Sequence, residues 1–217
     1  MMEKEKMKDF YNFCEIIAAL RAPDGCPWDR EQTHKSLSKH LIEEAYEAKE
    51  AIDSGNGEKI ADELGDVLLQ IVMHAQIGKE EGTFTIDDVI NSVSEKMIKR
   101  HPHVFGDSTV KNSAQVLENW EEIKKTQRGQ KYVYEELEHI TPSLPALYRC
   151  NKVIGKAKKA GFIEEKNSDF NITEEEIGEK LFEICTLSHQ CNINPEEALS
   201  SFTKKFIKKI KNIEENT

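Results

Sequence analysis

The sequence predicts an all-α protein, and three observations support this fold class. Apolar residues recur every three or four positions over long segments, which is the spacing of one face of an α-helix. The segments end at helix-stop signals such as Pro23, Gly82 and Gly161. The two most regular segments are joined by the short turn Ser54-Gly-Asn-Gly57, which makes them an antiparallel hairpin. We therefore expect a helical bundle organised around this pair.

Length, charge and cysteine usage narrow the class of protein. A chain of 217 residues can form one sizeable core or two small ones. Its net charge of −10 argues against a nucleic-acid or anionic-membrane partner. The five cysteines are odd in number and form no Cys-x-x-Cys pair, which favours a reducing compartment. No apolar run is long enough to span a bilayer, so we expect a cytoplasmic protein.

Five helices are predicted in the first part of the chain. The first is amphipathic and is broken by the Pro23–Asp29 loop. The fourth begins at Thr85, which forms a capping box with Asp88. The predicted ranges are residues 5–21, 36–53, 58–81, 86–100 and 114–125, and residues 101–107 between the last two are predicted to be a loop.

The second part of the chain is predicted as a linker followed by three helices. Residues 127–143 are polar and contain Gly129 and Pro142, which indicates a linker. Helices follow at residues 145–160, from Thr173 to His189, and from Asn194 onwards, where Pro195 takes the first helical position. These last helices faintly repeat residues 63–99. The expected domains are residues 1–126, which are catalytic, and residues 144–217, which are a degenerate, non-catalytic second repeat because the acidic helix is missing there.

The two helices beside the Ser54–Gly57 turn carry carboxylates on the faces that would meet. Glu44 and Glu47 lie three residues apart, as do Glu63 and Asp66, so each pair shares one side of its helix. At about 1.5 Å per residue, Glu47 and Glu63 both stand roughly 8–9 Å from the turn. Glu44 and Asp66 stand roughly 12–14 Å from it. The acidic pairs therefore face each other at matching heights, and a divalent cation would offset their repulsion.

The chemistry of these side chains favours Mg²⁺, with Mn²⁺ as a substitute. All four are carboxylates, and hard oxygen donors select such cations over softer metals. A di-iron site would need a histidine three residues after a glutamate, where Glu47 and Asp66 stand instead. Mg²⁺ in proteins usually binds substrate phosphates as well. The competing interpretation is a solvated acidic face, which we prefer for Glu50, Glu58 and Asp62.

Several motifs resemble the MazG family of nucleoside triphosphate pyrophosphohydrolases. The family pattern of Glu-Glu-x-x-Glu, a spacer and Glu-x-x-Asp matches Glu43-Glu44-Ala-Tyr-Glu47 and Glu63-Leu-Gly-Asp66. Further matches are Gly25-Cys-Pro-Trp-Asp29, Glu80-Glu-Gly82, Arg100-His-Pro-His-Val-Phe-Gly106, Asn119-Trp-Glu-Glu-Ile-Lys124 and Ser143-Leu-Pro-Ala-Leu147. The resemblance spans almost the whole chain. It implies an all-α, MazG-like helical bundle with a degenerate second helical repeat.

The resemblance also implies an activity and a set of site residues. The reaction would be Mg²⁺-dependent hydrolysis of a nucleoside triphosphate to the monophosphate and pyrophosphate, by attack of water on the α-phosphorus. The Mg²⁺ ligands would be Glu44, Glu47, Glu63 and Asp66, and Glu43 would either activate the water or support the ligands. Substrate contacts would come from His40, Lys59, Lys96, Arg100, Trp120 and Lys124. A homodimer is implied too, and the wide apolar face of residues 58–81 gives a physical reason for it.

Two other functions compete with this one. The chain could be a non-enzymatic module that binds nucleotide and metal, or a pyrophosphohydrolase restricted to one nucleotide such as dUTP or dCTP. An assay for released pyrophosphate distinguishes the non-enzymatic module from an enzyme. A panel of substrates identifies an enzyme that is restricted to one nucleotide.

The second half of the chain carries only part of the acidic pattern. Glu176 and Glu179 stand where a second acidic motif would end. No Glu-Glu-x-x-Glu helix accompanies them, and helix capping also explains Glu176, so we expect one catalytic cluster per chain.

Overall fold

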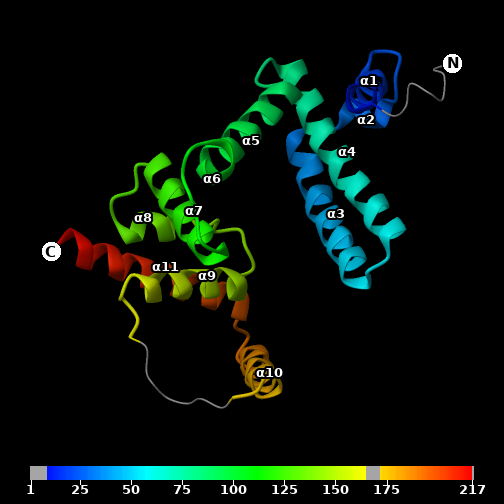
Figure 1. Ribbon diagram of the computed structural model, residues 1–217. Helices are drawn as coiled ribbons and strands as arrows, with labels where there is room; N and C mark the ends of the chain where they lie inside the picture. The colour runs from blue at the N-terminus through cyan, green and yellow to red at the C-terminus, as the bar shows by residue number, and fades with distance from the viewer. Residues whose placement is uncertain (1–8, 165–171, 217) are drawn as a thin grey trace. The chain divides into compact units, whose positions relative to one another are not determined.

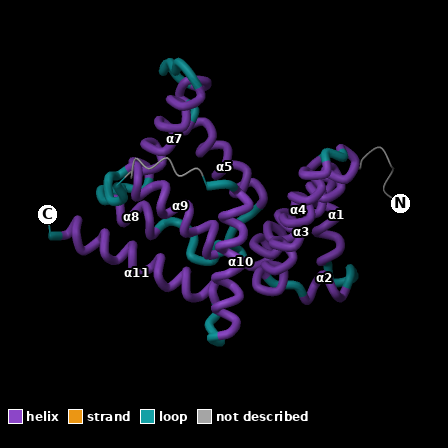
Figure 2. The backbone as a smooth tube through the Cα atoms, turned by 90° about the horizontal axis from the view of Figure 1, so that it is seen from below, coloured by secondary structure: helices purple, strands orange, loops and turns teal. Residues whose placement is uncertain are grey.

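The computed structural model describes residues 9–164 and 172–216, and these residues form eleven helices and no strand (Figures 1 and 2). The predicted all-α fold class is confirmed. The chain divides into two compact units, residues 1–107 and 108–217. The predicted start of the first helix at Glu5 lies outside the described residues.

The first unit is built around a long antiparallel helix pair, α3 and α4, against which α1 packs (Figure 1). Its core joins Ile17 of α1, Leu37 of α3 and three residues of α4, namely Val72, Met73 and Ile77. The helices are α1 (Phe10–Arg21), α2 (Pro27–Glu31), α3 (His34–Ser54), α4 (Gly57–Glu81), α5 (Ile86–Arg100) and α6 (Pro102–Phe105).

Local signals explain where α3 and α4 begin and end. Thr33 and Ser36 form a capping box at the start of α3. Gly55 ends α3 with φ of 68°, a left-handed conformation that glycine adopts without steric cost. The Asn56 side chain then accepts hydrogen bonds from the backbone N–H groups of Glu58, at 3.0 Å, and Lys59, at 3.3 Å. The predicted hairpin is therefore confirmed, together with the residues that turn it.

Two stretches that we expected to be loops contain short helices. Both α2 and α6 begin with a proline, Pro27 and Pro102, whose missing N–H costs nothing at the first helical position. Their turns are too short to show the periodicity of a helix in the sequence. In both stretches the loop prediction was wrong.

The second unit has its own core, formed mainly by α8, α9 and α11. Figure 1 shows α9 and α11 lying side by side, with α8 against them. The core residues are Leu137, Ile140, Val153, Ala157, Ile207 and Ile210. The helices of this unit are α7 (Ser113–Gln127), α8 (Val133–Glu138), α9 (Ala146–Lys159), α10 (Glu174–Gln190) and α11 (Pro195–Glu215).

The division between the units differs from the domain boundary expected from the sequence. It falls after Asp107, so that α7 belongs to the second unit rather than to residues 1–126. The stretch 127–143, expected to be a linker, contains α8 and the fully buried Leu137. Residues as distant in sequence as Ile207 cover this segment, so its own composition does not reveal its burial.

Candidate functional site

Three carboxylates meet where α3 faces α4. One carboxylate oxygen from each of Glu44, Glu63 and Asp66 lies within 4.8 Å of the others. Among the described residues this is the one group of three or more acidic, histidine or cysteine side chains close enough to hold a metal ion. The antiparallel course of α3 and α4 brings together residues that lie about twenty positions apart in sequence (Figure 1).

The charges of this carboxylate cluster repel one another. Partial burial raises the pKa of Glu44, and the neighbouring charges of Asp66, Glu47 and Glu63 raise it further. Partial burial also raises the pKa of Glu63, as do Glu47 and Asp66. A bound cation would favour the ionised forms and relieve the repulsion.

The donor set of the cluster suits a hard divalent cation. Three carboxylate oxygens could bind such an ion and leave coordination positions for water and phosphate, which is the usual arrangement for Mg²⁺. Glu47 does not belong to the group of three, but its charge acts on both Glu44 and Glu63.

Two of the expected substrate residues lie on the helices that carry the cluster. His40 is one turn before Glu44, and its Nδ1 lies 2.9 Å from Oε2 of Glu43. Lys59 lies in the first turn of α4, four residues before Glu63. These two residues therefore stand on opposite sides of the carboxylates along the helix pair.

The other four expected substrate residues lie elsewhere. Lys96 and Arg100 are near the end of α5, and Figure 1 shows this helix leaving α3 and α4 after the Gly82 turn and pointing away from them. Trp120 and Lys124 lie on α7, in the second unit. The carboxylates are thus gathered on α3 and α4, whereas the expected cations Lys96 and Arg100 are carried by a different helix.

Several titratable groups outside the carboxylate cluster have structural partners. Glu176 caps α10, because its Oε2 accepts hydrogen bonds from the Thr173 backbone N–H at 2.7 Å and hydroxyl at 3.1 Å. This confirms the capping explanation for Glu176.

Two histidines of the first unit contact each other. Nδ1 of His74 lies 2.7 Å from Nδ1 of His34. Burial, and then His34, lower the pKa of His74. The sequence did not reveal this partner, although the hairpin register places residues 34 and 74 at the same height.

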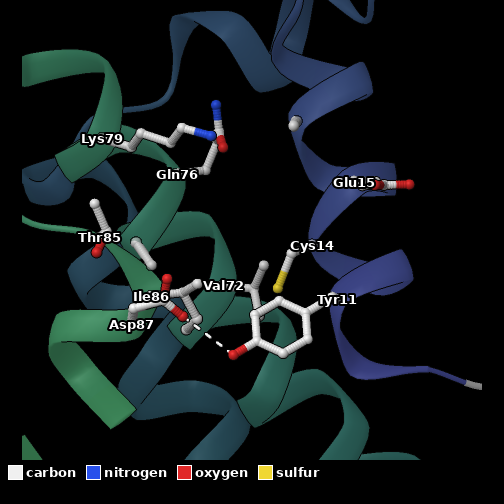
Figure 3. Close-up of a pocket in the computed structure, with 11 residues that line it drawn as sticks. Tyr11, Cys14, Glu15, Val72, Gln76, Lys79, Thr85, Ile86 and Asp87 are labelled. Atoms are coloured by element: carbon white, nitrogen blue, oxygen red, sulfur yellow. Dashed lines mark hydrogen bonds between the residues drawn. The ribbon is translucent and has the colours of Figure 1, made fainter. Parts of the chain in front are cut away.

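A cavity of about 300 Å³ lies between α1, α4 and the start of α5 (Figure 3). The Tyr11 hydroxyl donates a hydrogen bond to Asp87 at its edge, at 3.1 Å. Val72 lines the cavity, and it follows Glu63 by nine residues, which is about two and a half helical turns. The cavity and the carboxylate cluster are therefore on opposite sides of α4.

The fold and the cluster define an all-α protein with a site suited to a hard divalent cation. Residues 32–105, which include all three carboxylates, match the family model described as the MazG nucleotide pyrophosphohydrolase domain.

Individual relatives extend this match to nearly the whole chain. The chain is 44% identical to nucleoside triphosphate pyrophosphohydrolase/pyrophosphatase MazG of Thermotoga maritima, over 95% of the chain and 86% of that protein. It is 36% identical to nucleoside triphosphate pyrophosphohydrolase of Escherichia coli K12, over 92% of the chain and 84% of that protein. It is also 43% identical to the uncharacterized protein YabN of Bacillus subtilis, over 98% of the chain and 48% of that protein. The chain belongs to the MazG family.

The described helices were compared with the length and hydropathy of membrane-spanning helices. None of them combines the length and the apolar character needed to cross a bilayer.

Proposed function

We propose that this MazG-family protein hydrolyses nucleoside triphosphates to nucleoside monophosphates and pyrophosphate in a Mg²⁺-dependent reaction. Membership of the family and the names of its relatives support hydrolysis of nucleoside triphosphates. The observation that carries the Mg²⁺ requirement is the convergence of Glu44, Glu63 and Asp66. Carboxylates gathered in this way suit a cation that also binds phosphate.

Each acidic residue has a separate part in the proposed mechanism. Glu44, Glu63 and Asp66 would hold the cation, and Glu47 would add a fourth carboxylate nearby. A divalent cation bound there would supply positive charge for the phosphate oxygens and for the departing pyrophosphate. Glu43 orients or deprotonates the water that attacks the α-phosphorus. Its contact with His40, at 2.9 Å, supports this role because it restrains the carboxylate.

The cations proposed to bind the triphosphate come from more than one element. Lys59 belongs to the helix that carries Glu63 and Asp66, and Lys96 and Arg100 belong to α5. Trp120 and Lys124 of α7 contact the nucleotide. Positive side chains at the phosphates stabilise the charge that develops as pyrophosphate departs.

We propose a homodimer in which α5 of one copy serves the carboxylates of the other. In a single copy α5 points away from α3 and α4 (Figure 1). The same two helices expose large apolar side chains, and covering them would provide a driving force for association. These side chains are Ile42, Tyr46, Leu64, Leu68 and Ile71.

An assay of product release tests the proposal. The full chain is incubated with a panel of ribonucleoside and deoxyribonucleoside triphosphates and Mg²⁺ in water labelled with heavy oxygen. We expect pyrophosphate to be released and the label to enter the monophosphate, because the α-phosphorus is attacked. Glu63→Gln should abolish turnover, whereas the matched control Glu58→Gln should retain it. Binding of nucleotide without turnover would identify a non-enzymatic module instead, and a near-normal rate for Glu63→Gln would exclude the proposed metal site.

A further inference from the structure

An ion-pair network holds α7 against α8 and α9 in the second unit. Lys156 of α9 donates to Oε2 of Glu121 at 2.7 Å and to Oε2 of Glu136 at 3.2 Å. Lys124 donates to the other oxygen of Glu121 at 3.1 Å, and Lys125 lies 3.0 Å from Oε1 of Glu136. The network therefore includes Lys124, one of the residues proposed to contact the nucleotide.

The network contains three lysines and two glutamates, so that it has one positive charge in excess. Glu121 is shared between Lys124 and Lys156, and their hydrogen bonds lower the pKa of Glu121 to about 2 against the opposing effect of burial. The carboxylate is therefore ionised at neutral pH. A lysine ammonium has three N–H donors, and one contact with Glu121 leaves two on Lys124 for phosphate oxygens.

We propose that Lys156 is a positioning residue for nucleotide binding. By neutralising Glu121 and tying it to α9, Lys156 leaves Lys124 available to the triphosphate and fixes the position of α7. This inference rests on the proposed function, because it requires that Lys124 contacts the substrate. It assigns a role in substrate binding to the half of the chain that lacks a carboxylate cluster of its own among its described residues.

The physical reason is competition for one carboxylate. Without Lys156, the full charge of Glu121 would attract Lys124, and a bound phosphate would have to compete with that carboxylate. The side chain of Lys156 is 31% exposed and that of Lys124 is 24% exposed, so water screens the network only in part. Removing Lys156 should therefore weaken substrate binding and leave the chemistry at the carboxylates on α3 and α4 unchanged.

Steady-state kinetics of the full chain test the inference. For Lys156→Ala we expect KM to rise about tenfold, as for the loss of one charge-assisted hydrogen bond, while kcat stays within about twofold. Lys156→Arg keeps the charge and should restore KM. Lys152→Ala is the matched control, since Lys152 lies one turn earlier on α9 and its ammonium is placed 5.2 Å from the ring centre of Tyr148. If Lys156→Ala does not fold, Lys156→Gln is measured in its place.

A double variant distinguishes positioning from a general loss of structure. Because Lys156 acts through Lys124, the variant lacking both should have about the same KM as Lys124→Ala. If the two substitutions raise KM independently, so that their fold-increases multiply in the double variant, the inference is overturned. An unchanged KM for the Lys156 variants would overturn it as well. If Lys124→Ala itself leaves KM unchanged, the proposed contact of Lys124 with the nucleotide is wrong. If Lys124→Ala raises KM and the Lys156 variants do not, the positioning role alone fails.

Discussion

Replacing Glu80 by alanine should destabilise the first unit, because it would leave the charge of Arg21 without its carboxylate. The Arg21 side chain is only 6% exposed. Its Nε lies 3.0 and 3.1 Å from the two carboxylate oxygens of Glu80, and its terminal nitrogen Nη2 lies 2.7 Å from one of them. The other terminal nitrogen donates to the backbone carbonyl of Asp29, inside α2, and to that of Gln32, directly after α2, so Arg21 ties α1 to this short helix.

The contacts set the size of the expected effect. Breaking a buried ion pair by removing one partner costs about 3–5 kcal/mol. The Glu80 side chain is 37% exposed, and Arg21 keeps its two carbonyl contacts, so we expect a smaller loss of about 2–3 kcal/mol. At about 2–4 °C per kcal/mol for a chain of this size, the midpoint of thermal unfolding should fall by about 4–12 °C.

Urea unfolding followed by circular dichroism, together with thermal unfolding, measures this loss. Glu81→Ala is the matched control, since its carboxylate lies 3.7 Å from His34 in a more exposed pair. In the Arg21→Met background, Glu80→Ala should cost little, because no buried charge is left to compensate. The reasoning fails if Glu80→Ala loses less than about 0.5 kcal/mol, or if the two substitutions are simply additive.

Three further predictions concern the site and the second unit. If each site of the dimer combines the carboxylates of one copy with α5 of the other, mixing the inactive variants Glu63→Gln and Arg100→Ala should restore part of the turnover. No recovery after the subunits have exchanged would mean that both residues act within one chain. The ion pairs that depress the pKa of Glu121 stabilise the fold fully above the unfolded-state pKa of about 4.3. This stabilisation is lost as the pH falls towards about 2. Because the Glu121 side chain is 44% exposed, we expect it to contribute only about 1 kcal/mol to the free energy of unfolding. Acid unfolding of Glu121→Gln should lack that slope. Glu176→Gln should keep full turnover, because Glu176 caps α10 and glutamine can take the same capping position, so abolished turnover would reveal a second catalytic site.

Helix limits were predictable where the signals are local. The capping boxes at Thr85 and Thr173, the Asn194 cap and the left-handed Gly55 and Gly82 are all within a few residues of the helix ends that they determine. Because these contacts depend on neighbours in sequence, spacing alone identified them. The carboxylate cluster was predictable for the same reason, since one short turn fixes the register of α3 against α4.

Long-range contacts were not predictable in this way. The polar segment around α8 resembles a linker, yet Leu137 is covered by residues from α9 and α11. Arg21 and Glu80 are 59 residues apart, and Lys156 lies 35 residues from Glu121. Many lysines and glutamates in a chain that is 32% charged could form such pairs. Only the folded arrangement selects which of them do.

Contacts between α3 and α4 on both sides of the carboxylate cluster hold its three side chains near one another, because the carboxylates themselves repel. Towards the turn, the buried Ala48 and Ala51 allow α3 and α4 to approach closely. Away from the turn, His34 contacts His74 at 2.7 Å. These contacts place Glu44, Glu63 and Asp66 close together despite the repulsion between their charges, so a cation could bind them with little rearrangement. A single neutralising substitution in the cluster should therefore stabilise the metal-free protein while removing its response to Mg²⁺.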